Sequence, residues 1–226
     1  MRALIIQPDD DAPAGIVSSW LERREAEEDV YRIGAEARDC DAASYDLVVF
    51  LGSEAAAYDD AVPWLGEAER MLTEAVDADV PVLGICFGGQ LLARALGGSV
   101  GRAERPEIGW IRLRTQDPAL VPEGPWLGWH YDSFTPPPGA VLVAESAGAP
   151  HAFTIGRSLG IQFHPEVTTE IMEAWVRGAR DRLARDGVDP DELLAASLEH
   201  DAGNHARAWR LLDAFIDRVA RVERAA

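Results

Sequence analysis

Apolar residues in the first hundred positions occur in short, nearly continuous runs separated by segments with helical spacing. The pattern predicts strands at residues 3–7, 29–33, 47–51 and 80–85, and helices at residues 16–24, 63–76 and 91–96. Strands that are apolar on both faces and alternate with helices are typical of a parallel sheet covered on both sides. The first half of the chain therefore predicts an α/β fold.

The pattern changes after Gly98, where short apolar segments follow one another without long helical stretches between them. We predict antiparallel strands at residues 109–114, 140–145, 152–155 and 158–163. Helical spacing then returns at residues 168–185, 189–198 and 206–222. Because apolar helix stripes are mostly buried, we expect a domain over 1–185 and a helical extension over 186–226, packed on the domain in preference to a partner.

Length and composition fit one domain with a small appendage: 226 residues, 24.6 kDa and 47% hydrophobic residues. The 21 basic residues are all arginine, and 39 acidic residues bring the net charge to −18. A phosphate backbone or an anionic membrane would repel such a chain, so we expect neither nucleic acid nor membrane as a partner. The absence of lysine excludes a Schiff-base lysine and a P-loop lysine.

The number of cysteines and the N-terminal residues indicate in which cellular compartment the protein is expected. The two cysteines, Cys40 and Cys86, are too few for a disulfide framework. The first residues lack the apolar core and cleavage site of a signal peptide. No apolar run approaches the roughly 20 residues of a membrane helix. We therefore expect a cytoplasmic protein with reduced thiols.

The segment most informative about chemistry follows the strand predicted at 80–85. Cys86 lies between Gly84 and Gly88, and a helical pattern begins directly after it. This arrangement is typical of a nucleophile elbow, in which small neighbours make room for a residue on a tight turn. The helix N-terminus favours a thiolate, and the backbone N–H of Phe87 is suited to hold an oxyanion. A buried structural cysteine is the alternative interpretation.

One of the five histidines is well placed to serve as the base for this thiol. His164 ends the strand predicted at 158–163, and Pro165 and Glu166 follow it. Residues i and i+2 of an extended segment point to the same side, and Pro165 keeps His164 extended. Glu166 would then accept a hydrogen bond from one imidazole nitrogen and orient the other toward Cys86.

Other candidate ligands and nucleophiles carry less weight. No pair of Cys or His residues has the spacing of zinc ligands, and no calcium-binding loop is recognisable. We therefore expect neither a metal nor a cofactor. His200 and His205 are expected at the surface, and the acidic neighbours of Cys40 disfavour its thiolate.

The two motifs together resemble those of class I, triad-type glutamine amidotransferases. The resemblance rests on residues Gly84–Gln90 and Gln162–Glu166, extends to Leu51-Gly52-Ser53 and Gly128–Phe134, and covers roughly residues 1–180. It is strongest toward stand-alone members related to the amidotransferase half of GMP synthase. It implies a flavodoxin-like, three-layer α/β/α sandwich with a mostly parallel central sheet, here followed by a helical C-terminal extension.

The resemblance also implies roles for individual residues. Cys86 corresponds to the nucleophile, His164 to the general base and then acid, and Glu166 to the orienting carboxylate. The positions of the oxyanion hole are Gly52, Ser53 and the N–H of Phe87. The substrate-binding positions are Gly88, Gln90, His130, Tyr131 and Asp132.

The implied reaction is attack of Cys86 on a γ-glutamyl amide such as L-glutamine, with formation of a thioester and release of ammonia and glutamate. The chain has no synthase motif, so either a separate synthase accepts the ammonia or hydrolysis is the whole reaction. Two alternatives stay open: a γ-glutamyl peptidase or hydrolase acting on γ-glutamyl amines or peptides, and a catalytically silent subunit that binds a partner.

Three departures from the family pattern bear on the identity of the γ-glutamyl substrate. They are Ser53 in the oxyanion loop, Gly89 beside the elbow, and His151 before the Ala152-Phe153 pair. Ser53 would cost more than glycine if its loop takes a positive φ.

Overall fold

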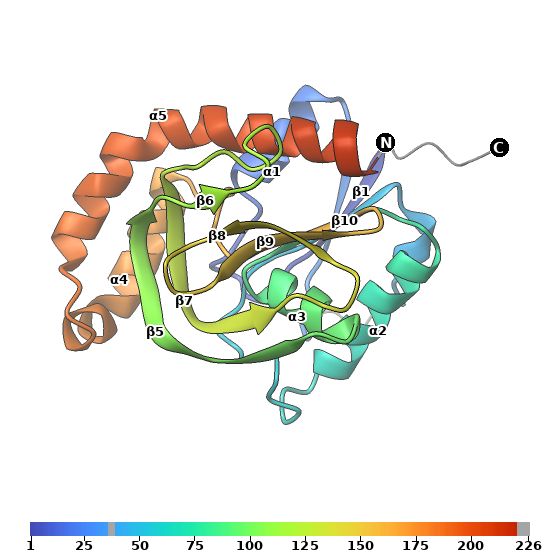
Figure 1. Ribbon diagram of the computed structural model, residues 1–226, viewed down its shortest axis with the longest axis horizontal. Coiled ribbons are helices and arrows are strands. Elements are labelled where there is room, and N and C mark those ends of the chain that lie inside the picture. Colours follow the sequence, from blue (N-terminus) through green and yellow to red (C-terminus); the bar gives the residue numbers. More distant parts are fainter. Residues whose placement is uncertain (36–38, 221–226) are drawn as a thin grey trace.

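The computed structural model describes residues 1–35 and 39–220 (Figure 1). Strands and helices alternate in its first half: β1 (Arg2–Ile6), α1 (Ile16–Arg23), β2 (Glu27–Tyr31), a 3-10 helix (Ala42–Ser44), β3 (Leu47–Phe50), α2 (Leu65–Asp77), β4 (Val82–Ile85) and α3 (Phe87–Ala95). Every strand predicted for this half is present. The helix α3 begins earlier than its periodicity predicts, directly after Cys86, as the elbow requires.

The second half consists mainly of strands and ends in helices: β5 (Ser99–Ile111), β6 (Arg114–Thr115), β7 (Trp126–Thr135), β8 (Val141–Glu145), β9 (Pro150–Ile155), β10 (Ser158–Ile161), α4 (Thr169–Arg185), α5 (Pro190–Ala214) and a π-helical segment (Phe215–Ala220). β5 and β7 pair as a separate two-stranded sheet, of which the sequence predicted only residues 109–114. No residue of β5 is fully buried, so the periodic signal there is weak.

The central sheet has the strand order β2–β1–β3–β4–β10–β9–β8–β6. The first five strands in this order are parallel, and the last three pair antiparallel beside them. Every residue of β3, β4 and β10 is buried, as expected for strands covered on both faces. The predicted α/β architecture with a mostly parallel central sheet is confirmed.

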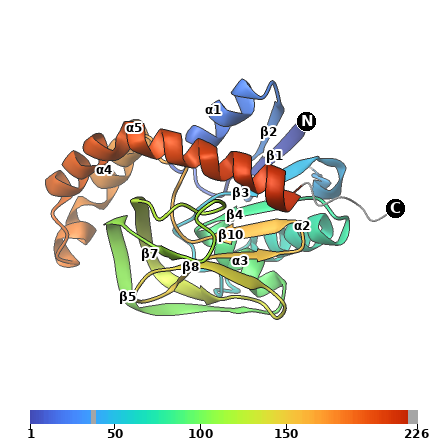
Figure 2. The same ribbon diagram turned by 45° about the horizontal axis from the view of Figure 1, so that its top comes forward.

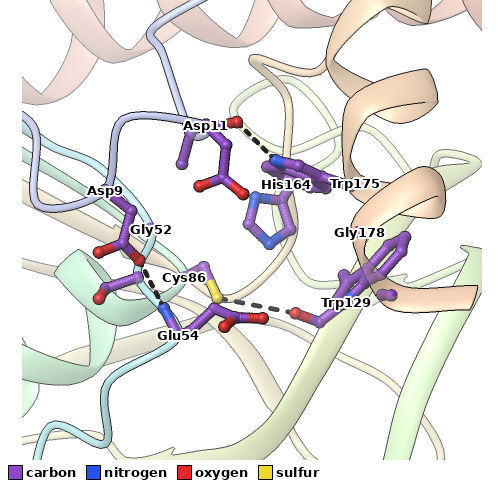
Figure 3. A pocket seen from close by; sticks show the side chains of 12 residues that line it. Asp9, Asp11, Gly52, Glu54, Cys86, Trp129, His164, Trp175 and Gly178 are labelled. Atoms are coloured by element: carbon purple, nitrogen blue, oxygen red, sulfur yellow. Dashed lines mark hydrogen bonds between the residues drawn. The ribbon is translucent and has the colours of Figure 1, made fainter. Parts of the chain in front are cut away.

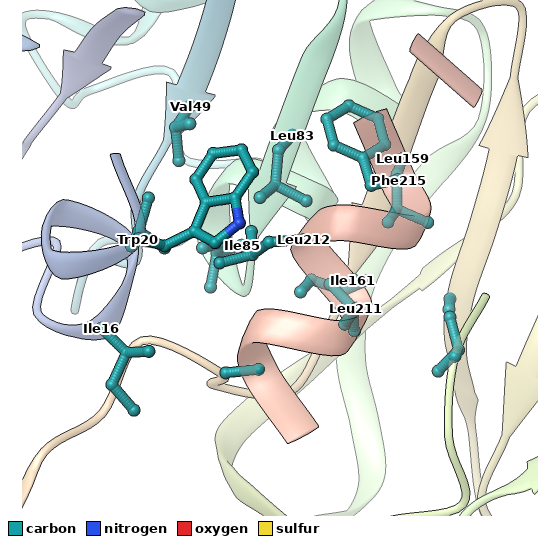
Figure 4. Packing of buried hydrophobic residues seen from close by; sticks show 14 of the residues in the cluster. Ile16, Trp20, Val49, Leu83, Ile85, Leu159, Ile161, Leu211, Leu212 and Phe215 are labelled. Carbon is teal, nitrogen blue, oxygen red and sulfur yellow. The ribbon is translucent and has the colours of Figure 1, made fainter. Parts of the chain in front are cut away.

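Helices cover the two faces of the sheet and form two hydrophobic clusters (Figure 2). On one face α1 and α5 pack over the strands, with Trp20, Leu211 and Phe215 against Leu159 and Ile161 (Figure 4). On the other face α2 and α3 pack against the opposite side chains of β1 and β3. The parallel strands are thereby fixed in the middle layer, and their carboxyl ends open toward one edge.

α5 is one continuous helix, which corrects the prediction of two helices separated near residues 199–205. Gly203 lies inside it, where glycine costs about 1 kcal/mol relative to alanine. Tertiary contacts hold the segment helical: Asn204 Nδ2 donates to the Val167 carbonyl at 3.1 Å, and Trp110 Nε1 donates to Ser197 Oγ at 3.0 Å. Residues 221 and 222 of the predicted helix lie outside the described residues.

The proposed extension over 186–226 contacts the domain along α5. Leu211, Leu212 and Phe215 belong to the same hydrophobic cluster as the sheet. Among the described residues, no helix is both long enough and apolar enough to cross a membrane.

Candidate active site

Cys86 lies between β4 and α3, at the carboxyl ends of the parallel strands. Its φ of 52° and ψ of −106° are uncommon for a residue with a side chain. The glycines on either side make this turn possible, because a Cβ on Gly84 would lie 2.5 Å from the Gly88 carbonyl oxygen and one on Gly88 only 2.1 Å from the Phe50 carbonyl oxygen. α3 therefore packs directly on the strands, and the sulfur faces a cavity (Figure 3).

His164 and Glu166 follow β10, the strand beside β4. His164 Nδ1 and Glu166 Oε1 are 2.6 Å apart, and both side chains are almost fully buried. Because an ionised carboxylate only accepts hydrogen bonds, Nδ1 carries a proton, and no hydrogen-bond partner is found for Nε2 within the described part of the chain. The structure thus brings together the three residues that the sequence predicted as a triad.

The protonation of His164 is controlled by its two neighbours. Burial alone would lower the pKa of His164, but the negative charges of Glu166 and Cys86, together with the hydrogen bond to Glu166, raise this pKa well above its ordinary value of 6.5. The imidazole therefore holds a proton close to the sulfur at neutral pH. Such a proton is available to a leaving amine.

The residues predicted to form an oxyanion hole lie beside the thiol. A Cβ on Gly52 would be 3.2 Å from His164 Cε1 and 3.7 Å from Cys86 Cβ, so this position has room only for glycine without a shift of the imidazole. Ser53 lines the same cavity and is not among the described residues with positive φ, so it carries no such backbone strain here. Phe87 is the first residue of α3, and its N–H therefore has no carbonyl within the helix to bond.

Two cavities meet at Cys86. The smaller, of about 180 Å³, contains the carboxylates of Asp9, Asp11 and Glu54 and the indoles of Trp129 and Trp175 (Figure 3). The larger, of about 450 Å³, is lined by more basic groups and by four of the predicted substrate residues. These are Arg102, Arg182 and Arg185, with Gln90, His130, Tyr131 and Asp132. The same thiol therefore faces one cavity with an acidic and aromatic lining and a second cavity whose lining includes three arginines.

Gln90 reaches the thiol through buried amide groups. Its Nε2 donates to the Asp132 carbonyl at 3.3 Å and to Gln162 Oε1 at 3.2 Å. Gln162 Nε2 in turn lies 3.6 Å from Cys86 Sγ. The predicted substrate residue and the thiol thus share one hydrogen-bonded chain. Gly88 differs from the other predicted substrate residues, because it packs on Phe50 and lines neither cavity.

Tyr131 and Asp132 line the larger cavity in contact with two of its arginines. The guanidinium carbons of Arg102 and Arg182 lie over the Tyr131 ring, 4.9 Å and 4.3 Å from its centroid. Its hydroxyl bonds Asp186 and accepts from Arg182 Nε. Asp132 pairs with Arg102 at 3.6 Å. This side of the cavity is therefore held in place from β5, β7 and α4.

Sequence reasoning missed the contribution of α4. The Trp175 ring stands edge-on to His164, with centroids 5.0 Å apart, and to Trp129 at 5.6 Å. Trp175 Nε1 also donates to the Asp11 carbonyl at 2.7 Å. Helical spacing placed Trp175 on an apolar stripe, and nothing in that spacing separates a cavity wall from core.

Comparisons with known proteins agree with this arrangement. The family model described as glutamine amidotransferase class-I matches residues 16–176. A GMP synthase [glutamine-hydrolyzing] of Thermus thermophilus is 43% identical over 186 residues, covering 68% of this chain and 36% of that protein. The same enzyme of Aeropyrum pernix is 38% identical over 140 residues, covering 55% and 27%. The chain thus spans about a third of the length of the curated relatives it matches.

Solved structures resemble the chain over nearly its whole length. A glutamine amidotransferase from Thermotoga maritima superposes with a TM-score of 0.87 at 28% identity, covering 96% of this chain and 98% of that one. One from Methylobacillus flagellatus has a TM-score of 0.87 at 25% identity, covering 100% and 98%.

Proposed function

Because the chain belongs to the class I glutamine amidotransferase family, we propose that it hydrolyses the side-chain amide of glutamine with Cys86 as the nucleophile. The observation that carries the proposal is the buried His164–Glu166 pair at 2.6 Å beside a thiol held at positive φ. A nucleophile, a base and a group that orients the base are the set that covalent amide hydrolysis requires.

The first half of the reaction releases ammonia. The Cys86 sulfur attacks the side-chain carbonyl carbon, and the negative oxygen is held by N–H groups at Gly52-Ser53 and Phe87. His164 gives its proton to the amide nitrogen, the carbon–nitrogen bond breaks, and a thioester remains. In the second half His164 takes a proton from water, which attacks the thioester and releases glutamate with the free thiolate.

We assign the two ends of glutamine to the larger cavity. Its arginines complement an α-carboxylate, and the carboxylate of Asp132 complements an α-amino group. Gln90 lies between this end and Cys86. The ammonia formed at Cys86 would be used by a separate synthase or released.

The deciding experiment measures glutamate released from L-glutamine by the full chain and by Cys86→Ala. We expect Cys86→Ala to lower kcat by about 10³-fold or more. Cys40→Ala is the matched control, since Cys40 is the other buried cysteine and lies in the cluster between α2 and the sheet. Glutamate release that survives Cys86→Ala would exclude the proposal.

The smaller cavity favours a second candidate, hydrolysis of a γ-glutamyl amide whose amine part carries a positive charge. Three carboxylates and two indoles next to the thiol suit an alkylammonium group, which they attract by charge and by cation–π contact. We expect the full chain to cleave a γ-glutamyl diamine with a higher kcat/KM than glutamine. Asp11→Asn should reduce only the former, and equal loss for both substrates would contradict this candidate.

A further inference from the structure

A second cluster of ionisable side chains lies outside the thiol site. Glu107 on β5 and His130 on β7 are direct cross-strand partners, so their side chains share a face. His151 reaches the same point from β9. Its Nε2 is 2.7 Å from Glu107 Oε2, and His130 Nε2 is 3.3 Å from the same oxygen.

The cluster is well removed from water. The side chains of His130 and His151 are 2% and 0% exposed, and that of Glu107 is 19% exposed. Among the described residues, His130 Nε2 and His151 Nδ1 have no hydrogen-bond partner of good geometry. Buried polar atoms of this kind require a partner, because their desolvation is otherwise uncompensated.

The orientation of His130 indicates which kind of partner its Nε2 needs. His130 Nδ1 is 3.0 Å from the Asp132 carbonyl oxygen, which only accepts, so Nδ1 carries the proton. With its proton on Nδ1, a ring without a second proton turns the Nε2 lone pair toward Glu107 Oε2, 3.3 Å away. Two electron-rich atoms face each other, and a positive centre between them removes the repulsion. A carbonyl that receives the second ring N–H is also the usual partner of a metal-bound histidine.

We propose that Glu107, His130 and His151 bind a divalent first-row transition metal, for which Zn²⁺ is the best match. Two imidazoles and one carboxylate are a donor set that Zn²⁺ accepts in proteins, whereas Mg²⁺ and Ca²⁺ prefer oxygen alone. Bonds of about 2.1 Å at tetrahedral angles put ligand atoms about 3.4 Å apart. The candidate ligand atoms here all lie within 4.8 Å of one another, so small side-chain shifts suffice.

The metal would position the wall of the larger cavity. The Asp132 carbonyl oxygen accepts from both His130 Nδ1 and Gln90 Nε2. A metal that fixes His130 therefore also fixes the stretch of β7 next to Gln90. Of the three ligands only His130 lines the larger cavity, and Glu107 and His151 line neither cavity at Cys86, so their substitution tests the metal separately from the proposed hydrolysis.

The test uses the full chain with Cys86→Ala, which removes the thiol as a competing ligand. After treatment with a chelator, Zn²⁺ is titrated by calorimetry, and Co²⁺ is added to report the coordination by its visible absorption. We expect one Zn²⁺ per chain and a Co²⁺ spectrum of low coordination number. Glu107→Gln and His151→Gln should each weaken Zn²⁺ binding by about 100-fold or more. Loss of a residue that only hydrogen-bonds to a metal ligand already costs up to about 100-fold, and a direct ligand should cost at least as much.

His205→Gln on α5 is the matched control and should leave the Zn²⁺ affinity unchanged. Circular dichroism and thermal melts of the metal-free variants establish that they are folded. Zn²⁺ binding that is insensitive to both ligand substitutions would overturn the proposal. A folded Cys86→Ala protein that binds neither Zn²⁺ nor Co²⁺ would also overturn the proposal. In that case a proton would be the positive centre between His130 and Glu107.

Discussion

At Cys86 one backbone conformation links packing to chemistry. A residue with a side chain at φ 52° is strained, by about 1–3 kcal/mol. Hydrogen bonds on both sides hold it there: its N–H donates to the Ile161 carbonyl at 2.8 Å, and its carbonyl accepts from Gln90 N–H at 2.9 Å. The strain is thus sustained by β10 on one side and α3 on the other, which are also the elements that carry His164 and Gln90.

His164 offers a prediction at the same scale. In Glu166→Gln the neighbouring negative charge is lost while the burial of His164 stays, so its pKa should fall from well above 6.5 to a clearly lower value. NMR titration of the imidazole measures this shift. The kcat for glutamine should drop by about 10³–10⁴-fold, as expected when a histidine loses its orienting carboxylate.

The raised pKa also makes stability depend on pH, with a defined sign. The His164 contribution to the free energy of unfolding is fully present below about pH 6.5 and is lost as the pH rises through the folded pKa.

The control for the Glu166→Gln titration is Glu173→Gln, on the exposed side of α4, which should leave the pKa of His164 unchanged. An unchanged imidazole titration in Glu166→Gln would refute this account.

Among the elements, the contact of α3 with the strands determines how closely Cys86 approaches His164. Gly88 lets the first turn of α3 touch β3, where a Cβ would be 2.1 Å from the Phe50 carbonyl oxygen. Gly89 does the same against β10, with a Cβ 2.4 Å from the Ile161 carbonyl oxygen. Both glycines therefore serve packing, including the one that sequence comparison marked as a departure near the substrate.

Gly88→Ala should push α3 away from β3. We expect the free energy of unfolding to fall by about 2 kcal/mol or more, as for overpacked cores, together with most of the glutamate release. Gly66→Ala in α2 is the control, because a Cβ there meets nothing within 4 Å and alanine favours the helix. Urea denaturation compares the two, and equal stability of both variants would contradict the packing argument.

Some elements of the fold could be predicted from the sequence and others could not. β3 and β4 could be predicted because they are buried on both faces, and the triad because His164 and Glu166 are adjacent to a strand end. The pair β5 and β7 is half-buried and lacks periodicity. The cavity walls at Trp175 and Asp11 depend on how α4 docks, and the Glu107 cluster joins three strands, so no local spacing reveals either.

On the scale of the whole molecule, α5 belongs to the core of the domain. Phe215 is 1% exposed and packs with Leu159 and Ile161 of β10. β10 leads directly to His164. The stability of the C-terminal helix and of the thiol site are therefore coupled through one hydrophobic cluster.

Phe215→Ala should accordingly destabilise the entire domain, by about 3–5 kcal/mol for a large core truncation. Fluorescence and circular dichroism should report the same single unfolding transition. Leu198→Ala on α5 is the control, since Leu198 is 58% exposed and its loss should change stability little. Separate transitions for α5 and the sheet would show that residues 186–226 form an independent unit.

The edge-on contact between Trp175 and His164 should also affect the fluorescence of Trp175. Protonated imidazole quenches indole fluorescence at short range, and these two rings are 5.0 Å apart. In the proposed reaction His164 would pass its proton to the leaving amine, and the indole would then lose its quencher. Emission from Trp175 should therefore brighten when the thioester forms and dim again when it is hydrolysed, so that each turnover can be followed optically without a label.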